Sequence, residues 1–437
     1  MTISKSHQLN PSILREYDIR GIVPSTLSIL DVQVIGSVFG TMLLEKGGKT
    51  VAVGYDGRLS SPELEDALVK GLVASGAEVI RIGLGPSPML YFATETLPAD
   101  AGVMVTGSHN PPDYNGLKMT IGSKPFFAED IRELGARAKA GDYFDGEGKV
   151  SNKTVIVEYV SRLLADFEAC DGKPIKVAWD PGNGAAGKAV EMLTKRLPGN
   201  HILLNEKIDG TFPAHHPDPT VESNLSQLKE IVANHRCDIG IAFDGDGDRI
   251  GVIDSRGRVL WGDQLLVILA AEVIEEYPGA IIIADVKSSS VFFDEITRMG
   301  GQPLMWKTGH SHIKNKMIET GALLAGEMSA HIFFKHRYYG FDDALYVSIR
   351  LLSALNRTGN SLASIIDNLP EMINTPELRI DCSEDRKFEV VDEVQSRLLG
   401  LDNIIVNDID GVRVQTKDGW WLLRASNTQA ALVARCE

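Results

Sequence analysis

Cysteine is scarce in this chain, and its spacing is as informative as its number. The 437 residues include four cysteines, at positions 170, 237, 382 and 436, and no two of them form a C-x-x-C pair. A disulfide framework requires denser cysteines, and the common zinc sites require paired ones. The sequence therefore predicts a protein of a reducing compartment, the cytoplasm.

Long apolar runs and an excess of positive charge are also missing. No apolar stretch approaches the roughly 18 residues that a membrane-spanning helix needs, and the first residues lack the apolar core of a secretory signal. Lysine and arginine number 44 against 59 aspartates and glutamates, which gives a net charge of −15. This balance argues against nucleic acids and anionic membranes as partners, although a local basic cluster can still bind an anion.

A pattern of apolar strands separated by helical segments occurs three times in the chain. The three units begin with strands at residues 51, 175 and 280, and their third strands lie at 101–105, 238–243 and 322–325. In the first unit a helix is expected from a Ser60 cap, with Glu63 in its first turn, to Gly76. The alternation predicts α/β domains with parallel strands and right-handed crossovers.

In each unit the third strand ends in a polar loop. These loops cover residues 106–116, 244–249 and 326–331. Sites in open α/β sheets form beyond the carboxyl ends of strands, so the three loops are expected at one cleft. This convergence is the strongest argument from the residues alone that the protein is an enzyme.

The C-terminal part of the chain has a different pattern. After a helical stretch at 351–369, residues 377–381, 410–414 and 420–424 are predicted strands of a small mixed sheet, with a turn at 417–419. The segment from Arg424 to Thr428 then offers a guanidinium, two hydroxyls, an amide and backbone N–H groups to an oxyanion. The predicted domains are 1–150, 151–257, 258–368 and 369–437.

The first polar loop places Ser108 at the end of a buried strand. Two prolines fix the turn after it, His109 is its neighbour, and Lys118 follows a few residues later. A serine in a loop is most often a turn former or a helix cap. The histidine, the fixed turn and the lysine instead favour a serine that carries or transfers a phosphoryl group.

The second polar loop has carboxylates at alternate positions, Asp244, Asp246 and Asp248, separated by glycines. Three hard oxygen ligands at this spacing can face one divalent cation, and Mg²⁺ prefers such ligands. The D-x-D-x-D pattern also begins calcium EF-hand loops, but Arg249 stands at the glycine position and Ser255 at the final glutamate position. A solvated acidic turn is the other alternative. The metal site is the better interpretation.

The third loop carries a carboxylate, a hydroxyl and an imidazole. Glu327 and Ser329 can bind sugar hydroxyls, and His331 can contact phosphate or transfer protons. His310 can relay protons or bond a backbone carbonyl, and Lys287 leaves the end of an apolar strand. Alone, the residues of this loop would be interpreted as a polar surface loop, whereas Lys287 is harder to dismiss because lysine is rarely placed at a buried strand edge. Together the loops indicate phosphoryl transfer on a polyol phosphate.

Four motifs in order then identify a family. T-G-S-H-N-P-P, D-G-D-G-D-R, G-E-M-S-x-H and R-x-S-N-T resemble the α-D-phosphohexomutases, closest to the bacterial phosphomannomutase/phosphoglucomutase group. The resemblance covers nearly the whole chain. It implies three related α/β domains with mixed sheets, and a smaller α+β C-terminal domain similar to TATA-binding-protein folds, around a central cleft.

The resemblance also implies an activity. Ser108 would be carried as phosphoserine, with Mg²⁺ held by its phosphate and by Asp244, Asp246 and Asp248. Glucose or mannose 1-phosphate and 6-phosphate would interconvert through a 1,6-bisphosphate, with glucose 1,6-bisphosphate as activator. The protein would act as a cytoplasmic monomer on phosphorylated hexoses, with no nucleic-acid or membrane partner.

Further residues match the family motifs one by one. Glu327 and Ser329 match the pair that reads the sugar 3- and 4-hydroxyls, and His109, Lys118, Arg249 and His310 match residues near the reacting phosphoryl group. The distal phosphate loop and other cleft contacts correspond to Arg424, Ser426, Asn427, Thr428, Tyr17, Arg20, Lys287 and His331. Because one distal loop would hold either phosphate, the sugar must turn around between two half-reactions and the C-terminal domain must hinge.

Two departures leave alternatives open. The chain ends at Glu437, where relatives usually continue with one or two helices over the last sheet, so a bare apolar sheet face is expected. The phosphate loop has Ala430 where many relatives have proline. A phosphoglucosamine mutase is a second interpretation, disfavoured because Met328 stands where those enzymes usually carry glutamine. A phosphosugar-binding protein with impaired catalysis is the third.

Overall fold

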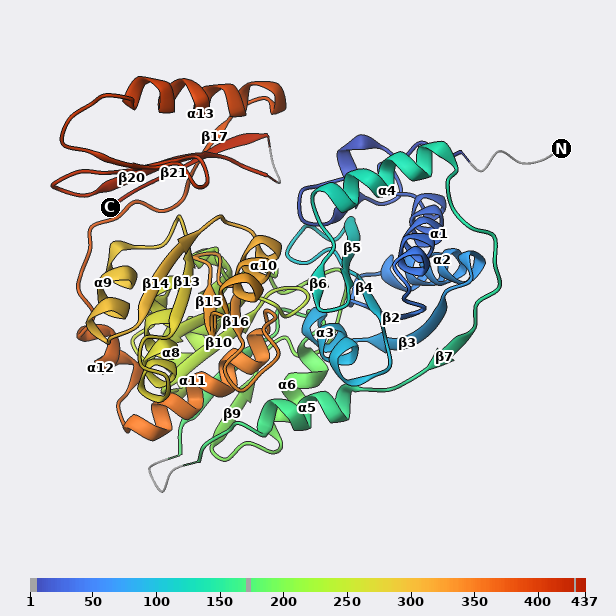
Figure 1. The fold of residues 1–437 in the computed structure, drawn as a ribbon. Coiled ribbons are helices and arrows are strands. Elements are labelled where there is room, and N and C mark those ends of the chain that lie inside the picture. Colours follow the sequence, from blue (N-terminus) through green and yellow to red (C-terminus); the bar gives the residue numbers. More distant parts are fainter. Residues whose placement is uncertain (1–5, 170–173, 428–429) are drawn as a thin grey trace.

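The computed structural model describes residues 6–169, 174–427 and 430–437. Four sheets follow one another along the chain, and Figure 1 shows the C-terminal one set above the third. Within the described residues every helix is too short or too polar to span a lipid bilayer. Cys237, Cys382 and Cys436 form no disulfide within this part of the chain, and Cys170 lies outside it.

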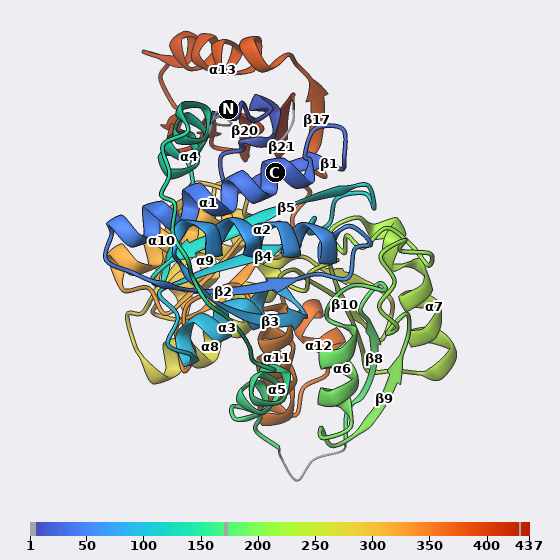
Figure 2. The same ribbon diagram turned by 90° about the vertical axis from the view of Figure 1, so that its right-hand side faces the viewer.

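The first sheet has the order β1-β5-β4-β2-β3-β7, with β6 beside β5. Helices α1 and α2 cover one face and α3 the other (Figure 2). Its strands are β1 (Ile19–Ile22), β2 (Thr50–Tyr55), β3 (Glu78–Leu84), β4 (Ala101–Val105), β5 (Tyr114–Ile121), β6 (Lys124–Pro125) and β7 (Val150–Asn152). Its helices are η1 (Pro11–Ile13), α1 (Ile29–Glu45), α2 (Ser61–Ser75), α3 (Ser87–Thr96) and α4 (Glu129–Ala140).

The second sheet has the order β12-β11-β10-β8-β9, and the third has the order β14-β13-β15-β16. The second contains β8 (Lys176–Asp180), β9 (Asn200–Leu203), β10 (Ile239–Phe243), β11 (Ile250–Asp254) and β12 (Val259–Leu260), with α5 (Ile156–Leu164), α6 (Gly187–Thr194), η2 (Glu222–Leu225) and α7 (Ser226–His235). The third contains β13 (Ile281–Asp285), β14 (Gln302–Trp306), β15 (Leu324–Gly326) and β16 (Ile332–Phe334), with α8 (Gly262–Glu276), α9 (Ser290–Arg298), α10 (His310–Thr320), α11 (Ala344–Thr358) and α12 (Leu362–Asp367).

Each of these three sheets is mixed, which confirms what the family resemblance implied and adds antiparallel strands to the parallel ones expected from the alternation of strands and helices. The third strand of every unit pairs antiparallel with the strand that follows it: β4 with β5, β10 with β11, and β15 with β16. The three polar loops are therefore turns between a buried parallel strand and its antiparallel neighbour. This arrangement fixes both ends of each loop, which is what a site built on loops requires.

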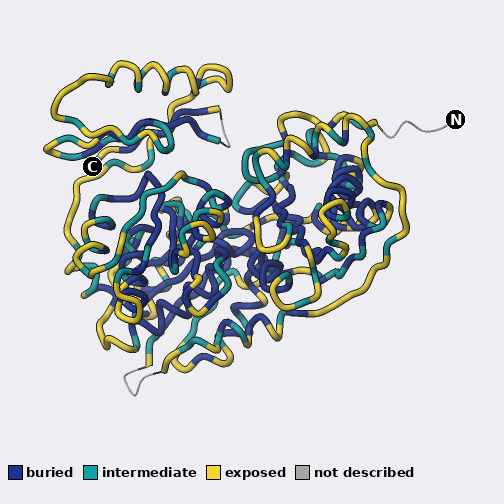
Figure 3. Tube along the Cα trace, in the orientation of Figure 1, coloured by how far each residue is buried: buried dark blue, intermediate teal, exposed yellow. Residues whose placement is uncertain are grey.

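One apolar core joins the first three domains. It includes Met104 of the first sheet, Trp179 and Phe243 of the second, and Ile282 of the third, all buried. Figure 3 shows this continuous dark-blue interior across all three. Because interiors of this kind are close-packed and transmit strain, the three loops are held in a fixed mutual arrangement.

The C-terminal sheet is antiparallel throughout, in the order β17-β21-β20-β19-β18. It is built from β17 (Leu378–Asp381), α13 (Glu384–Leu398), β18 (Ile405–Asn407), β19 (Val412–Gln415), β20 (Trp420–Ala425) and β21 (Ala431–Cys436). Helix α13 and strand β18 are absent from the sequence-based prediction.

The expected bare sheet face is only partly found. On one face Val412 and Leu432 pack against Val391 of α13, and on the other Trp420 and Leu422 pack on Val286 of the third domain. Apolar exposure remains on the edge strand β17, where Leu378 is 43% and Ile380 50% exposed.

Candidate active site

Ser108 stands in the turn between β4 and β5 with its backbone in the left-handed region, at a φ of 47°. Asp56 stabilises this turn, because its Oδ2 accepts hydrogen bonds from the Gly107 N–H (3.0 Å) and the Thr106 hydroxyl (2.8 Å). The Ser108 N–H in turn donates to Thr106 Oγ1 at 2.8 Å. These bonds offset the strain of a positive φ in a residue other than glycine.

Arg58 stabilises the same turn by hydrogen bonds to its backbone carbonyl oxygens. Its guanidinium donates to the carbonyl oxygens of Ser108 (2.7 Å), Asn110 (2.6 Å) and Tyr114 (3.0 Å), and also to that of Pro111. The side chain is fully buried. Because arginine presents several N–H donors in one rigid plane, it can fix the carbonyls of a whole loop at once.

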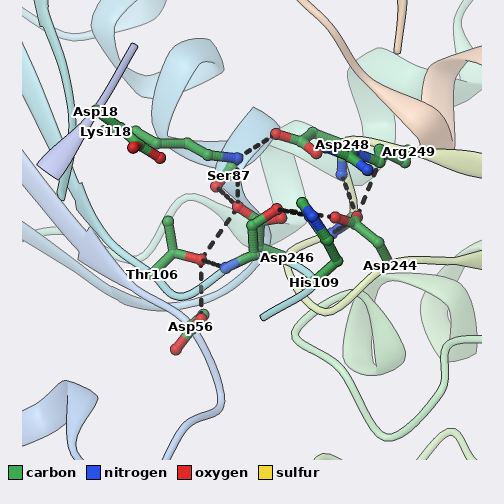
Figure 4. A network of polar contacts seen from close by, with 12 residues as sticks. Asp18, Asp56, Ser87, Thr106, His109, Lys118, Asp244, Asp246, Asp248 and Arg249 are labelled. Atoms are coloured by element: carbon green, nitrogen blue, oxygen red, sulfur yellow. Dashed lines mark hydrogen bonds and ion pairs between the residues drawn. The ribbon is translucent and has the colours of Figure 1, made fainter. Parts of the chain in front are cut away.

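The acidic loop lies directly against this turn, as Figure 4 shows. Ser108 Oγ is 3.1 Å from Asp244 Oδ2 and 3.2 Å from His109 Nδ1. The other oxygen of Asp244 accepts backbone N–H groups from residues 247, 248 and 249, which fixes the loop's curvature. Burial, together with the neighbouring charges on Arg249 and Arg20, lowers the pKa of His109 well below its usual value, so its ring is a neutral acceptor.

Three carboxylates of the loop converge on one point. Asp244, Asp246 and Asp248 are fully buried, and a ligand atom from each lies within 4.8 Å of the others. Asp246 Oδ1 and Asp248 Oδ1 have no hydrogen-bond partner among the described residues. Buried carboxylates carry a large desolvation cost unless a cation compensates it. The donor set therefore fits a hard divalent cation such as Mg²⁺.

Lys118 partly compensates the negative charge of the acidic loop. It extends from β5, and its ammonium is 2.8 Å from Asp246 Oδ2 and also bonds Asp248 (Figure 4). Burial raises the pKa of Asp244, reinforced by the two neighbouring aspartates. Burial also acts on Asp246, but there the charge and hydrogen bond of Lys118 prevail and hold the pKa below its usual value.

The third loop, between β15 and β16, meets the acidic loop through an arginine and a histidine. Arg249 Nε donates to His331 Nε2 at 2.9 Å. Glu327 is buried and accepts the Gly309 N–H at 2.6 Å. Burial raises the pKa of Glu327, partly opposed by His331. Ser329 follows in the same turn, half-buried.

His310 and Tyr17 extend the site towards the C-terminal domain. The His310 ring centroid is 5.6 Å from that of His331 and 6.0 Å from that of Tyr17. The Tyr17 hydroxyl donates to the Thr308 carbonyl (2.9 Å) and accepts a hydrogen bond from the Asn427 amide. A chain of contacts thus runs from the acidic loop to the phosphate loop of the last domain.

The remaining predicted residues lie along this chain of contacts. Arg20 donates to the Thr106 carbonyl at 2.8 Å, and Arg424 bonds Asp410 at 3.0 Å while one of its terminal nitrogens stays unpaired among the described residues. Lys287 pairs with Glu377 at 3.0 Å. Ser426 opens the phosphate loop at the end of β20, and Thr428 lies outside the described residues.

Comparison with known proteins agrees with this geometry. Four family models match in order: phosphoglucomutase/phosphomannomutase α/β/α domain I at residues 11–143, domain II at 157–257, domain III at 261–373, and the C-terminal domain at 377–437. The chain belongs to the phosphoglucomutase/phosphomannomutase family. The four sequence motifs had indicated the same family.

Individual members of the phosphoglucomutase/phosphomannomutase family align over nearly the whole chain. A phosphomannomutase/phosphoglucomutase of Pseudomonas aeruginosa is 44% identical over 100% of this chain and 94% of that protein. A phosphoglucomutase of Neisseria meningitidis is 43% identical over 97% of this chain and 92% of that protein. A crystal structure of a family protein from Burkholderia thailandensis superposes with a TM-score of 0.91 at 40% identity, covering 100% of this chain and 94% of that one.

Several residues of the site were missed by the sequence analysis. Asp56 and Arg58 follow the carboxyl end of β2, so the argument from strand ends would have found them if applied to the first strand of the unit as well as the third. Ser87, which bonds Asp246, follows β3 in the same way. Lys314 and Asp342 lie on α10 and in the loop before α11, where no local pattern marks them.

Proposed function

We propose that this protein is a phosphohexomutase that interconverts the 1- and 6-phosphates of glucose and mannose. Ser108 would carry the phosphoryl group, and a hexose 1,6-bisphosphate would be the intermediate. One observation carries the proposal: the Ser108 hydroxyl lies 3.1 Å from a buried carboxylate of a three-aspartate cluster and beside a neutral histidine. A serine in such surroundings can accept and return a phosphoryl group, since the cluster provides for a metal ion and the histidine can accept a proton.

The acidic cluster would hold Mg²⁺ through Asp244, Asp246 and Asp248, together with the phosphate on Ser108. When bound, Mg²⁺ neutralises phosphate charge and polarises the phosphoryl oxygens. The chain's own cations would complete this stabilisation, since Arg249 and Lys118 both lie against the aspartates. Phosphoryl transfer depends mainly on such positioning and charge compensation.

Each half-reaction breaks one O–P bond and forms another. In the first, the bond between Ser108 Oγ and phosphorus breaks and the free sugar hydroxyl gains the phosphoryl group, losing its proton to a base of the site. In the second, the bond between phosphorus and the other sugar oxygen breaks, Ser108 Oγ gives up its proton and regains a phosphoryl group, and the freed sugar oxygen takes up a proton. His331 and His310 lie close enough to the acidic loop to serve in these proton movements. Burial lowers the pKa of His310, with a further contribution from Lys314, so its ring is neutral.

The far end of the substrate would be held by the C-terminal domain. Arg424, Ser426, Asn427 and Thr428 are proposed to bind the phosphate that does not react, with Tyr17, Arg20 and Lys287 as further contacts. Glu327 and Ser329 would bind the sugar 3- and 4-hydroxyls. Glucose and mannose differ only at carbon 2, so this recognition predicts activity on both sugars. The predicted cytoplasmic monomer, activated by glucose 1,6-bisphosphate, is part of the same proposal.

A coupled mutase assay tests the proposal. Glucose, mannose and glucosamine 1-phosphates are supplied with Mg²⁺ and a trace of glucose 1,6-bisphosphate, and formation of the 6-phosphates is followed. Turnover of the first two sugars, abolished by Ser108→Ala with the fold intact, is expected. The Ser108→Ala protein should also lack the mass of one phosphoryl group that the parent protein carries.

The other outcomes separate the alternatives. Preference for glucosamine 1-phosphate would assign a phosphoglucosamine mutase, against the argument from Met328. If protein shown by mass to carry phosphoserine had no turnover, the third interpretation, a phosphosugar-binding protein with impaired catalysis, would be assigned. Unaltered steady-state rates in Ser108→Ala would overturn the phosphoserine role.

A further inference from the structure

The three related domains share a buried aspartate at the end of their first strand. Asp56 follows β2, Asp180 ends β8 and Asp285 ends β13. In the first and third domains this aspartate accepts a backbone N–H from the polar loop of the same domain, that of Gly107 at 3.0 Å and that of Met328 at 3.1 Å. In the second domain Asp180 has different partners, and it has no role in the function proposed above.

One oxygen of Asp180 shapes the turn that follows β8. Its Oδ1 accepts the Gly182 N–H at 3.0 Å. Further along this turn the Ala185 N–H donates to the carbonyl oxygen of Gly245, the second residue of the acidic loop, at 2.9 Å. A Cβ on Gly184 would lie 2.8 Å from the same carbonyl oxygen. The turn after β8 and the acidic loop are therefore in direct contact.

The other oxygen of Asp180 bonds a histidine from a segment remote in the sequence. His215 Nε2 is 2.9 Å from Asp180 Oδ2, and His215 Nδ1 is 3.0 Å from the carbonyl oxygen of His216. Because a carboxylate and a carbonyl only accept, both ring nitrogens donate and the ring is an imidazolium. Burial opposes this charge, but the hydrogen bond and the charge of Asp180 prevail and raise the pKa of His215. The contact is thus a charge-assisted hydrogen bond, which is stronger than a neutral one.

Pro217 connects this histidine with the acidic loop. A Cβ on Gly182 would lie 3.3 Å from His215 Cε1 and 3.4 Å from Pro217 Cβ. A Cβ on Gly245 would lie 3.4 Å from Pro217 Cγ and 2.4 Å from the Ser108 carbonyl oxygen. Gly245 is thus enclosed between Pro217 and the Ser108 turn. Because such close packing transmits displacements, a shift of Pro217 would move the acidic loop and the serine relative to each other.

We propose that His215 and Asp180 are positioning residues of the catalytic site. Their ion pair fixes Pro217 against the acidic loop, and the same carboxylate fixes the turn that bonds the Gly245 carbonyl. Neither residue meets substrate, since they act by holding the loop at the curvature at which its aspartates and Ser108 converge. This inference rests on the proposed function, because its kinetic consequence requires that the loop and the serine carry out phosphoryl transfer.

Hydrogen exchange measures the rigidity of the acidic loop without turnover. The N–H groups of residues 247, 248 and 249 are bonded to Asp244, so they are expected to exchange slowly in the parent protein. His215→Phe removes both ring hydrogen bonds, and these amides should exchange about tenfold faster, as for the loss of one hydrogen bond's contribution. Unchanged exchange would overturn the proposal, and an equal acceleration in β8 and β10 would assign the effect to folding, against it. The measurement needs neither metal nor substrate, so a failed mutase assay leaves it decisive.

Metal affinity and kinetics test the consequence for catalysis. His215→Phe should weaken Mg²⁺ binding, measured by titration calorimetry, and lower kcat, each about 10–100-fold, the usual range for groups that orient metal ligands, with KM for glucose 1-phosphate within about twofold. His215→Gln keeps a donor for Asp180 and should recover part of both losses. Unchanged Mg²⁺ affinity and kcat in His215→Phe, or losses as large in His215→Gln, would contradict positioning.

His201 provides a matched control in the same domain. Its ring is also half-buried and accepts a hydrogen bond from Trp179 Nε1 at 3.1 Å, but it lies on the edge strand β9. His201→Phe should lower the melting temperature while the exchange of the acidic loop, the Mg²⁺ affinity and kcat stay unchanged. Changes as large as those in His215→Phe would assign both effects to folding, against the proposal.

Discussion

Lys287 and Glu377 form an ion pair that joins the third domain to the segment leading into the last one. The Lys287 ammonium is 3.0 Å from Glu377 Oε2, and the two side chains are only 8% and 19% exposed. Lys287 follows β13, and Glu377 immediately precedes β17. The pair thus ties a proposed substrate contact to the domain that is expected to hinge.

This pair makes the joint between the domains sensitive to acid. The charge of Lys287 lowers the pKa of Glu377 from 4.5 to about 2, although burial opposes it. A carboxyl whose pKa is depressed by folding stabilises the fold above its unfolded pKa, and this contribution is lost as the pH falls from 4.5 towards 2. The shift corresponds to about 3 kcal/mol. Glu377→Gln should therefore lower the melting temperature at pH 7 and have progressively less effect below pH ~4.5.

The comparison is made by calorimetry of both proteins at several pH values. Glu389→Gln is the control, because Glu389 is 65% exposed in a surface pair with Arg386 and its loss should change little at any pH. A Glu377→Gln effect of constant size from pH 3 to 7 would contradict the role of the ion pair.

Lys118 should determine how strongly the protein depends on its metal. Its ammonium compensates Asp246 and Asp248, and removing one partner of a buried ion pair costs about 3–5 kcal/mol. Lys118→Met should therefore lower the melting temperature strongly in EDTA, and added Mg²⁺ should restore much more of it than in the parent protein.

Lys314→Met is the matched control for this test. Lys314 is also a buried lysine in an ion pair, but its partner is Asp342 and not the acidic loop. Its loss should lower stability without enlarging the effect of Mg²⁺. If Mg²⁺ raised the melting temperature of Lys118→Met and of the parent protein by the same amount, Lys118 would not compensate the carboxylates that bind the metal.

Arg58 should control the catalytic turn without meeting substrate. Lysine cannot serve the several carbonyls that Arg58 serves, so Arg58→Lys should let the Ser108 turn shift and lower kcat about 10–100-fold. Gly107→Ala should act alike, since its Cβ would lie 2.2 Å from Arg58 Nε. Arg132→Lys, at a 60% exposed arginine, should leave kcat unchanged. An unchanged kcat in both Arg58→Lys and Gly107→Ala would show that Arg58 does not hold the Ser108 turn in its catalytic position.

The three polar loops could be predicted from the sequence because the residues of each are contiguous and follow an apolar strand. Asp244, Asp246 and Asp248 are neighbours in the chain, so their spacing alone indicates a common ligand. Asp342 reaches the same place from a loop that follows β16 by several residues, and only the antiparallel return of the chain brings it there. Contacts made by tertiary pairing leave no local pattern.

The missed elements have equally physical reasons. Strand β18 has only three residues, and α13 buries little beyond Lys387 and Val391, so neither has a clear hydrophobic period. Ser60 is the N-cap residue of α2 as predicted, but its hydroxyl accepts from the Asn115 amide at 2.9 Å and makes no bond to the helix N-terminus. A tertiary partner took the group that local reasoning assigned to the helix.

Tyr17 should couple the first domain to the phosphate loop of the last. Its hydroxyl connects the Thr308 carbonyl with the Asn427 amide, and one hydrogen bond contributes about 1 kcal/mol. Tyr17→Phe should therefore raise KM for glucose 1-phosphate about fivefold and leave kcat nearly unchanged. Tyr277→Phe, at a 52% exposed tyrosine, is the control for the loss of a hydroxyl.

A double variant shows whether the effect passes through Asn427. If the Tyr17 hydroxyl acts by holding the Asn427 amide, then Tyr17→Phe should add nothing to the KM of Asn427→Ala, because the contact is already lost. Additive increases in KM would mean that Tyr17 contacts the substrate independently of the loop. An unchanged KM in Tyr17→Phe alone would mean that the C-terminal domain closes on substrate without this contact.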